Sequence, residues 1–334
     1  MVRVLVATHP ATVPIGGIAV LYDMVRSLVR AGYDAAVWLP RRLQAGDWPY
    51  DEAPMVYGST LDLTIDDLLV VSEVGIRPGS DPAPGARKVI YNQNHFFTLG
   101  AWTAPGAPYS DWTPAPAIWT VSREAAAVLR SLTDRDDVHL VYPRTDFSLF
   151  APRGKQPGSV VLMPRKRPQQ AELLARLLRD RFADSGTELD LRVIDGLSRE
   201  KVAETLATTV TFIALGQREG LGLPVVEALA SGCHVIGYSG GGGRELFDAP
   251  SATLINDDCV TDLVEVVWKR TTTAADGAPA NRDWVVSHYG EDALTAVLLH
   301  AVSDAAAVPS RQVTAQHPVV NLQHLDPAFF APVG

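Results

Sequence analysis

Short apolar runs alternate with stretches of helical periodicity at the start of the chain. Residues 1–8 form a run rich in Val and Leu, which is typical of a buried parallel strand. Apolar residues then recur every three or four positions over residues 18–28, and Gly32 follows as a helix stop. The run at residues 35–39 predicts the next strand. A strand, a helix and a strand in this order predict a parallel sheet covered by helices.

The same alternation continues to residue 142 and starts again after residue 154. Ser122 stands before the helical stretch at residues 123–132 and can cap its first turn. Between the two series, residues 150–154 have the composition of a linker. Further strands are predicted at residues 68–74, 88–92, 117–121, 139–142, 160–163, 191–194, 210–215, 235–237 and 253–255, and further helices at residues 169–182, 200–206, 225–230 and onwards to about residue 307.

Two such series predict an α/β fold with two doubly wound, Rossmann-like domains. We expect these domains at residues 1–152 and 153–307, in line with a length of 334 residues. Residues 308–334 lack periodicity, and we expect them either to pack across the domains or to be disordered. Open α/β sheets bind ligands at the carboxyl ends of their strands, so the expected binding site is a cleft between the two sets of strand ends.

Composition and charge narrow the classes of partner. Apolar residues make up 47 % of the chain and charged residues 20 %, as in ordinary globular proteins. The formal net charge of −9 argues against nucleic-acid binding, which needs clustered Lys and Arg. A small anionic ligand needs only two or three cations in one place. Such a ligand stays open, as does a peripheral membrane contact through a local basic patch.

Cysteine usage and the lengths of the apolar runs indicate the compartment. Cys233 and Cys259 are too few for a disulfide scaffold, and neither belongs to a Cys-x-x-Cys pair that would bind zinc. No stretch resembles a secretory signal, and none approaches the roughly 18–20 apolar residues of a membrane span. We therefore expect a cytoplasmic protein without a structural metal.

The most informative segment begins at Glu219, leaves a predicted strand through a loop and enters a helix. Gly220 and Gly222 let backbone N–H groups of this loop approach a ligand closely. The amino terminus of the helix offers unpaired N–H groups and a positive dipole end, which suit a phosphate. Glu219 and Glu227 can then face one cleft and accept hydrogen bonds from sugar hydroxyls. Either glutamate alone would be read as a solvated charge, but the whole string favours a sugar-phosphate site.

Cations and glycines that suit a phosphate follow two other predicted strands. Arg165, Lys166 and Arg167 come directly after the strand that opens the second series. Three cations at a strand end would neutralise a diphosphate, and an exposed basic loop is the alternative. Gly16 and Gly17 stand in the loop after the first strand, where a glycine pair is a weaker signal for phosphate binding.

His95 is the candidate for acid–base chemistry in the first half. It follows the strand at residues 88–92, where a histidine can reach a ligand at the strand ends. A structural histidine is the equal alternative, with Gln93 or Asn94 as the polar contact. His9, at the end of the first strand, is a second candidate.

The segment from Glu219 to Gly232 resembles the signature of family 4 of the retaining glycosyltransferases, the group 1 type, which have the GT-B fold. In that family two glutamates separated by seven residues flank a Gly-x-Gly-x-Pro core. The resemblance covers most of residues 1–300 and is strongest over residues 191–256. Its other parts are the helix and strand at residues 197–215, the strand and glycine turn at 234–245, the glycine pair at 16–17, and the linker at 141–150, in which Arg144 and Thr145 replace the family's Asn-Gly.

The resemblance implies roles for the matching residues. Glu227 would bind the ribose hydroxyls of a nucleotide, and Glu219 the hydroxyls of the donor sugar. The backbone N–H groups implied to contact the diphosphate are those of Gly16, Gly17, Gly222 and Leu223.

The basic loop departs from the family pattern at one position. Arg165 matches the family's arginine, but Gln169 and Gln170 stand where a lysine is usual. Lys166 or Arg167 would have to supply the second cation.

Together these residues predict a retaining glycosyltransferase that moves a sugar from a nucleoside-diphosphate sugar to an acceptor hydroxyl. The expected catalytic residues are His95, Glu219 and Arg165. The donor is a co-substrate, and no cofactor or metal ion is expected. Two alternatives stay open: a sugar-nucleotide 2-epimerase, and a non-catalytic nucleotide-sugar-binding partner in a glycan-assembly complex. The donor base, the acceptor and the oligomeric state are not determined at this level.

Overall fold

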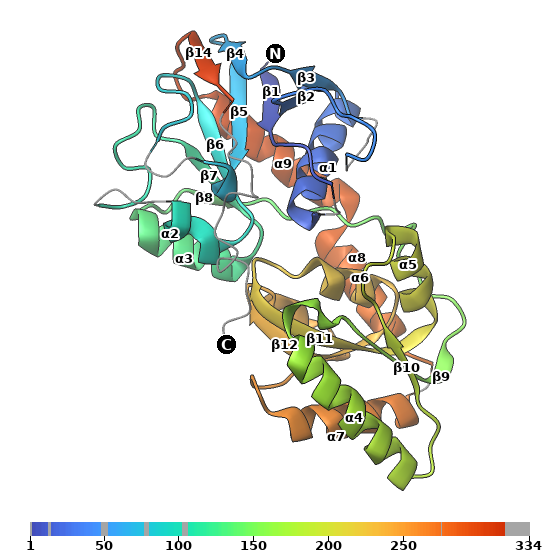
Figure 1. Ribbon diagram of the computed structural model, residues 1–334. Coiled ribbons are helices and arrows are strands. Elements are labelled where there is room, and N and C mark those ends of the chain that lie inside the picture. The colour runs from blue at the N-terminus through green and yellow to red at the C-terminus, as the bar shows by residue number, and fades with distance from the viewer. Residues whose placement is uncertain are drawn as a thin grey trace. The chain divides into compact units, whose positions relative to one another are not determined.

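The computed structural model describes residues 2–12, 15–47, 53–76, 80–101, 106–274 and 276–317. The chain divides into two compact units, each built around its own parallel sheet (Figure 1). The first unit comprises Met1–Arg144 together with the chain that returns at Glu291, and the second comprises Thr145–Gly290. Among the described residues, no helix is both long and apolar enough to cross a membrane.

These boundaries differ from the expected domains at residues 1–152 and 153–307. The last long helix, α9 (Glu291–Ala306), belongs to the first unit, where it contacts α1 (Gly16–Arg30) and buries one apolar face. Glu291 at its start forms ion pairs with Arg30 and Arg144. Periodicity could predict this helix but not the sheet that its apolar face covers.

The first sheet contains seven parallel strands among the described residues, and its central strands are buried along all or nearly all of their length. Strands buried on both faces need nearly continuous apolar sequence, which explains the Val- and Leu-rich runs. In sheet order the strands are β3 (Met55–Tyr57), β2 (Asp34–Leu39), β1 (Arg3–Ala7), β5 (Asp67–Ser72), β6 (Lys88–Asn92), β7 (Ala117–Thr120) and β8 (Val138–Leu140).

Two helices and two 3-10 turns described in this unit follow the carboxyl ends of β5, β6 and β7. The helix α3 (Arg123–Thr133) confirms the expected cap, because the Ser122 hydroxyl accepts a hydrogen bond from the backbone N–H of Ala125 at 3.2 Å. The other elements are η1 (Glu73–Gly75), η2 (His95–Phe97) and α2 (Thr98–Ala101).

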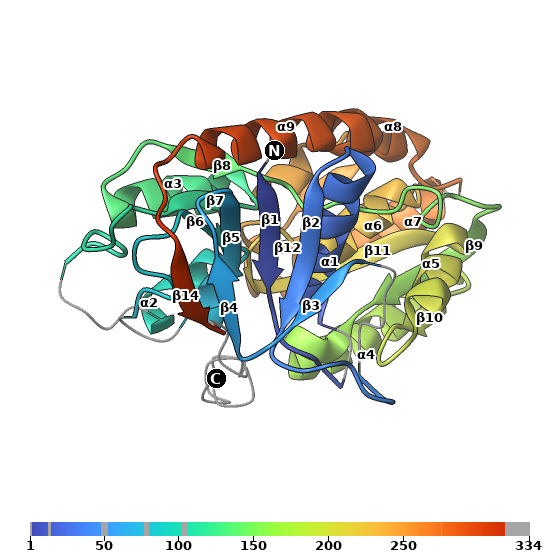
Figure 2. The ribbon, with the colours of Figure 1, turned by 90° about the horizontal axis from the view of Figure 1, so that it is seen from above.

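The expected tail contributes a strand to the first unit. Residues 313–316 form β14 (Val313–Gln316), which pairs antiparallel with β4 (Thr60–Leu63), as Figure 2 shows. Ala315 points into the core and is only 2 % exposed. Neither strand was predicted, because each is short and is stabilised by backbone pairing with the other. The rest of the expected tail, residues 318–334, lies outside the described residues.

In the described part of the second unit, five parallel strands form the second sheet. Its helices α4 (Pro168–Asp184) and α7 (Val260–Thr273) pack against β9 (Gln156–Leu162) and β11 (Thr209–Glu219). The core between them includes Leu174, Ile213 and Val267. In sheet order the strands are β10 (Asp190–Val193), β9 (Gln156–Leu162), β11 (Thr209–Glu219), β12 (His234–Gly241) and β13 (Ala252–Leu254); the other elements are η3 (Pro164–Lys166), α4 (Pro168–Asp184), α5 (Arg199–Thr208), α6 (Leu223–Ala230), η4 (Arg244–Asp248), α7 (Val260–Thr273) and α8 (Pro279–Tyr289).

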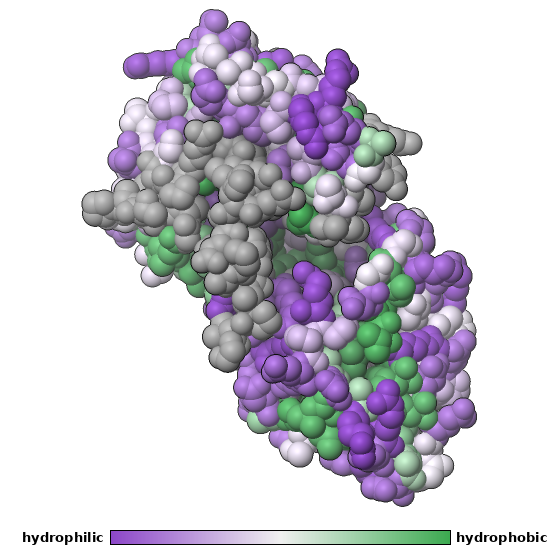
Figure 3. Space-filling model, in the orientation of Figure 1, coloured by the Kyte–Doolittle hydropathy of each residue, from purple (hydrophilic) through white to green (hydrophobic). Residues whose placement is uncertain are grey.

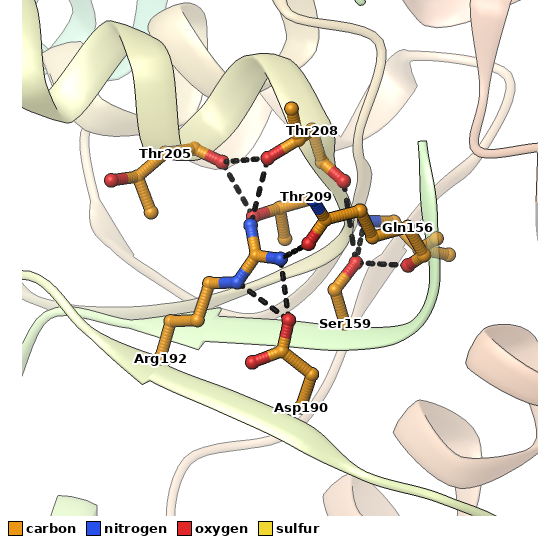
Figure 4. A network of polar contacts seen from close by, with 8 residues as sticks. Gln156, Ser159, Asp190, Arg192, Thr205, Thr208 and Thr209 are labelled. Carbon is orange, nitrogen blue, oxygen red and sulfur yellow. Dashed lines mark hydrogen bonds and ion pairs between the residues drawn. The ribbon is translucent and has the colours of Figure 1, made fainter. Parts of the chain in front are cut away.

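A polar network fastens the amino-terminal edge of this sheet (Figure 4). Arg192 on the edge strand β10 donates to the hydroxyl of Thr208 at 2.8 Å and to that of Thr209 at 3.3 Å. It also contacts Asp190 and Gln156, so one guanidinium group joins the starts of β9, β10 and β11.

On the face seen in Figure 3, hydrophilic residues cover most of the second unit, with hydrophobic residues in groups between them.

Three local expectations need correction. Gly16 and Gly17 do not lie in a loop but are the first two residues of α1. Glu219 also lies outside the expected loop, at the end of β11, because backbone pairing with β12 continues beyond the apolar run. The helix α6 begins at Leu223, two residues before the start that was expected at residue 225.

Candidate functional site

The carboxyl end of β11 carries an irregularity that positions Glu219. The register between β11 and β12 shifts between Gly216 and Glu219, and Arg218 within this shift adopts a left-handed conformation with φ of 48°. A bulge of this kind bends a strand and redirects its side chains, and bulges are common beside functional sites.

Gly216 and Gly242 allow β11 and the turn after it to pack closely against the end of β12. We call these two residues the glycine cradle. The Gly242 N–H donates to the Glu219 carbonyl at 3.1 Å. A Cβ atom on Gly242 would lie 2.0 Å from the Gly220 carbonyl oxygen, and one on Gly216 would lie 2.6 Å from the Tyr238 carbonyl oxygen. Only glycine fits such backbone contacts, so the glycines fix the path of the chain from residue 216 to residue 222.

The helix α6 begins directly after this turn. Gly222 is its N-cap residue, with φ of 92°, and no side chain caps the helix. The first N–H groups of a helix have no partner within it, so α6 presents its positive end at the carboxyl edge of the sheet. No acidic residue stands in its first turn. This end of α6 suits an anion.

Glu227 lies one turn further along α6 and is partly buried. Burial raises the pKa of its carboxyl group to about 7, although the positive charge of Arg199 opposes the shift. No hydrogen bond joins this carboxyl group to any residue that the structure describes. Its oxygens are therefore available to a ligand that donates hydrogen bonds.

The three cations after β9 have different surroundings. The Lys166 Nζ lies 2.8 Å from the Glu219 Oε1 and 3.1 Å from the Gln217 carbonyl oxygen. Arg165 is exposed and has no hydrogen-bond or ion-pair partner in the described parts of the chain.

Arg167 is held by contacts on three sides. It donates to the Gly216 carbonyl at 3.2 Å, forms ion pairs with Asp257 at 3.1 Å and Asp258 at 3.3 Å, and stacks over the ring of Tyr238. Of the three predicted cations, Arg167 therefore has the most contacts to lose on binding a ligand, and Arg165, which has no partner among the described residues, has the fewest.

In the first unit, Glu73 follows the carboxyl end of β5, and the candidate His95 follows the carboxyl end of β6. Glu73 is buried, and each of its carboxylate oxygens accepts one backbone hydrogen bond, from Gln93 at 2.9 Å and from Asn94 at 3.0 Å. Burial raises the pKa of Glu73 to about 7. Glu73 thereby shapes the turn that leads into His95.

His95 begins the turn η2 and is 6 % exposed. Burial lowers the pKa of its imidazole, with the negative charge of Glu124 opposing, so the ring is neutral near pH 7. Its Nδ1 atom has no hydrogen-bond partner among the residues described. Its ring packs against Phe96, with 4.2 Å between the centroids.

The amino terminus of α1 adjoins the same turn. A Cβ atom on Gly17 would lie 3.1 Å from the Gln93 Oε1. Because Ile15 is the N-cap residue and offers no side-chain bond, the N–H groups at Gly16 and Gly17 have no partner among the described residues and can bind an anion. His9 is buried at the end of β1, where burial and then the charge of His317 lower its pKa.

Two residues near these candidates did not follow from the sequence. Glu73 gave a signal, because a carboxylate inside the apolar run at residues 68–74 must find partners when buried. His317 gave none, since it comes from the other end of the chain; it lies against Trp38, with 4.6 Å between the ring centroids. No group of three metal-ligating side chains occurs in the described ranges, and the expected absence of a metal stays a prediction.

Comparison with known proteins addresses the chemistry of this site. The family described as glycosyl transferases group 1 matches residues 176–267, which include both Glu219 and Glu227. An alpha-1,6-glucosyltransferase of Actinobacillus pleuropneumoniae serotype 7 is 26 % identical over 236 residues, covering 67 % of this chain and 69 % of the relative.

Solved structures share the fold over most of the chain. A variant of S. aureus TarM, in complex with fondaparinux, alpha-GlcNAc-glycerol and UDP, superposes with a TM-score of 0.68 at 10 % identity, covering 92 % of this chain and 100 % of TarM. Anabaena HepE, in complex with UDP and glucose, gives a TM-score of 0.59 at 11 % identity over 91 % of this chain and 100 % of HepE. The family match, the relative and the shared architecture lead to one conclusion: this chain is a glycosyltransferase, an enzyme of the EC 2.4 class with the GT-B fold, and its residues 176–267 are similar to the glycosyl transferases of group 1.

Proposed function

We propose that the chain is a retaining glycosyltransferase that moves a sugar from a nucleoside-diphosphate sugar to a hydroxyl group of a glycan or another acceptor. The arrangement at the carboxyl edge of the second sheet carries this proposal. Along the chain, Glu219 precedes and Glu227 follows the amino terminus of α6, which no side chain caps, and Arg165 and Lys166 follow the neighbouring strand. Carboxylates accept hydrogen bonds from hydroxyls, and helix N–H groups and cations bind phosphates.

Each group has a proposed role in holding the donor. Glu227 accepts hydrogen bonds from the ribose hydroxyls, which its unpartnered carboxyl group supports. Glu219 binds hydroxyls of the donor sugar, and the backbone N–H groups of Gly222 and Leu223 bind the diphosphate. In the first unit, the amino terminus of α1 at Gly16 can bind an anion by the same principle.

The chemistry follows from where charge develops in the reaction. When the bond between sugar and diphosphate breaks, negative charge grows on the leaving diphosphate and positive charge on the sugar ring. Arg165, Lys166 and the amino end of α6 stabilise the leaving group more strongly in the transition state than in the ground state. We assign to His95 a contact with the reacting sugar or the acceptor as a neutral imidazole. Retention of configuration rests on the family resemblance.

The ligands of similar proteins suggest which donor to test first. TarM and HepE were solved with UDP, HepE also with glucose, and the curated relative is a glucosyltransferase. UDP-glucose is therefore the first donor to try, and glycan hydroxyls are the first acceptors.

Calorimetric titration of UDP, GDP, ADP and dTDP, and of UDP-glucose, tests the donor site. We expect one nucleotide to bind wild-type protein and to bind Glu227→Ala at least about tenfold more weakly, a loss of about 1.4 kcal/mol. Glu200→Ala is the matched control, because Glu200 is an exposed glutamate on α5. It should leave the affinity unchanged.

The outcomes separate the remaining alternatives. Failure of every nucleotide to bind wild type would contradict the proposal. Binding without transfer or hydrolysis would indicate a non-catalytic partner, and conversion of the donor to its 2-epimer without an acceptor would indicate an epimerase.

A further inference from the structure

An ion pair joins two of the groups that the proposed function needs separately. The Lys166 Nζ lies 2.8 Å from the Glu219 Oε1, and the two side chains are only 27 % and 20 % exposed. Lys166 follows β9 and Glu219 ends β11, and these strands are neighbours in the sheet. While they are paired, the ammonium group faces a carboxylate rather than a phosphate, and the carboxylate faces an ammonium group rather than a sugar hydroxyl.

The neighbouring arginines take no part in this pairing. Arg167 is engaged with the Gly216 carbonyl, Asp257 and Asp258. Arg165 has no partner among the described residues and can meet a phosphate without losing one. Lys166 is therefore the cation whose binding to a ligand is coupled to Glu219.

Glu219 is held in place, so it has little freedom to turn away when Lys166 leaves it. Its side-chain stem lies directly over Gly240, where an added Cβ atom would come within 2.8 Å of the Glu219 Cγ. Its carbonyl oxygen accepts the Gly242 N–H at 3.1 Å. A mostly buried carboxylate that loses its cation, stays in place and gains no hydrogen-bond donor is unfavourable.

We propose that the Lys166–Glu219 ion pair makes the site prefer the sugar-loaded nucleotide over the free nucleoside diphosphate. This inference rests on the proposed function. A nucleoside-diphosphate sugar offers a phosphate to Lys166 and hydroxyls to Glu219, so both members of the pair find new partners. A free nucleoside diphosphate takes Lys166 and leaves Glu219 unpartnered beside a phosphate of like charge. The pair thus opposes retention of the product after the sugar has been transferred.

A double-mutant cycle tests this coupling, with Glu219→Gln, Lys166→Met and the double variant titrated by calorimetry. The probes are UDP, UDP-glucose and inorganic pyrophosphate, which carries neither base nor sugar. Glu219→Gln should bind UDP and pyrophosphate about tenfold more tightly than wild type does, equivalent to about 1.4 kcal/mol. It should not bind UDP-glucose more tightly. In the Lys166→Met background, Glu219→Gln should tighten no probe.

Two results would overturn the inference while leaving the proposed function intact. One is equal tightening by Glu219→Gln in the wild-type and Lys166→Met backgrounds, because the effect would then be general removal of negative charge. The other is unchanged or weaker binding of UDP and pyrophosphate by a folded Glu219→Gln protein, as checked by circular dichroism. Asp257→Asn is the matched control: it removes a carboxylate paired with Arg167 and should tighten pyrophosphate binding far less. Failure of all probes to bind wild type would instead overturn the proposed function.

Discussion

At the scale of single residues, two carboxyl groups have a pKa near neutrality for the same reason but differ in their partners. Burial raises the pKa of both Glu73 and Glu227 to about 7. Glu73 receives two backbone hydrogen bonds, one on each oxygen, and so serves the structure of its turn. Glu227 receives none from the described residues. That difference, rather than the pKa, distinguishes a positioning group from one that is available to a ligand.

The pKa of Glu227 predicts how nucleotide affinity depends on pH. The value lies above the ordinary 4.5, so the group is mostly protonated at pH 6 and ionises as the pH rises through about 7. An ionised carboxylate accepts hydrogen bonds more strongly than a neutral one. Calorimetry at pH 6, 7 and 8 should therefore show UDP affinity rising with pH in wild type.

Glu227→Gln controls for titration of the nucleotide itself. In this variant, the dependence of UDP affinity on pH should reflect only the ionisation of the UDP phosphates. Parallel profiles for wild type and Glu227→Gln would show that Glu227 does not titrate on binding.

At the scale of elements, the glycine cradle decides where the loop before α6 runs. Gly242→Ala would place a Cβ atom 2.0 Å from the Gly220 carbonyl oxygen, so the turn from Glu219 to Leu223 would have to shift. We expect a loss of nucleotide affinity of at least about tenfold and a stability loss of about 1–3 kcal/mol. Calorimetry and denaturant unfolding measure the two effects.

Gly154→Ala is the control for this substitution. Gly154 lies in the same unit, has no atom within 4 Å of an added Cβ and does not have a positive φ. It should leave both quantities close to wild type. Equal effects from the two substitutions would mean that the cradle has no special part in shaping the site.

At the scale of the whole molecule, residues from the far end of the chain complete the first unit. The strand β14 pairs with β4, and Ala315 is buried while the adjacent Gln316 is exposed. Ala315→Glu would place a charge in the core, whereas Gln316→Glu adds the same charge on the outer face. We expect Ala315→Glu to lower the free energy of unfolding by roughly 2–4 kcal/mol.

Hydrogen exchange can locate this effect. In Ala315→Glu, peptides from β4 and β14 should exchange faster, and peptides from the second sheet should exchange as in wild type. Gln316→Glu should change neither set. Faster exchange throughout both units would contradict the assignment of β14 to the first unit alone.

Much of the architecture could be predicted because it depends on short-range physics. Apolar runs and helical periods predicted most strands and helices, and the Ser122 cap was read correctly from its place before the helix. The segment from Glu219 to Glu227 also indicated its own chemistry, because glycines, a helix start and two carboxylates lie within a few residues. The role of each site residue stays a prediction.

What only the tertiary structure decided depends on residues far apart in the chain. Hydrophobic periodicity fixes which face of a helix is apolar, but not which sheet covers that face, so the unit that holds α9 could not be predicted. An apolar pattern also says nothing about backbone pairing between short strands such as β4 and β14. A run of three cations predicts a positive surface, yet only packing pairs Lys166 with Glu219 and occupies Arg167 elsewhere. Ion pairs and strand pairings form between surfaces that folding brings together, and local sequence carries no information about the partner.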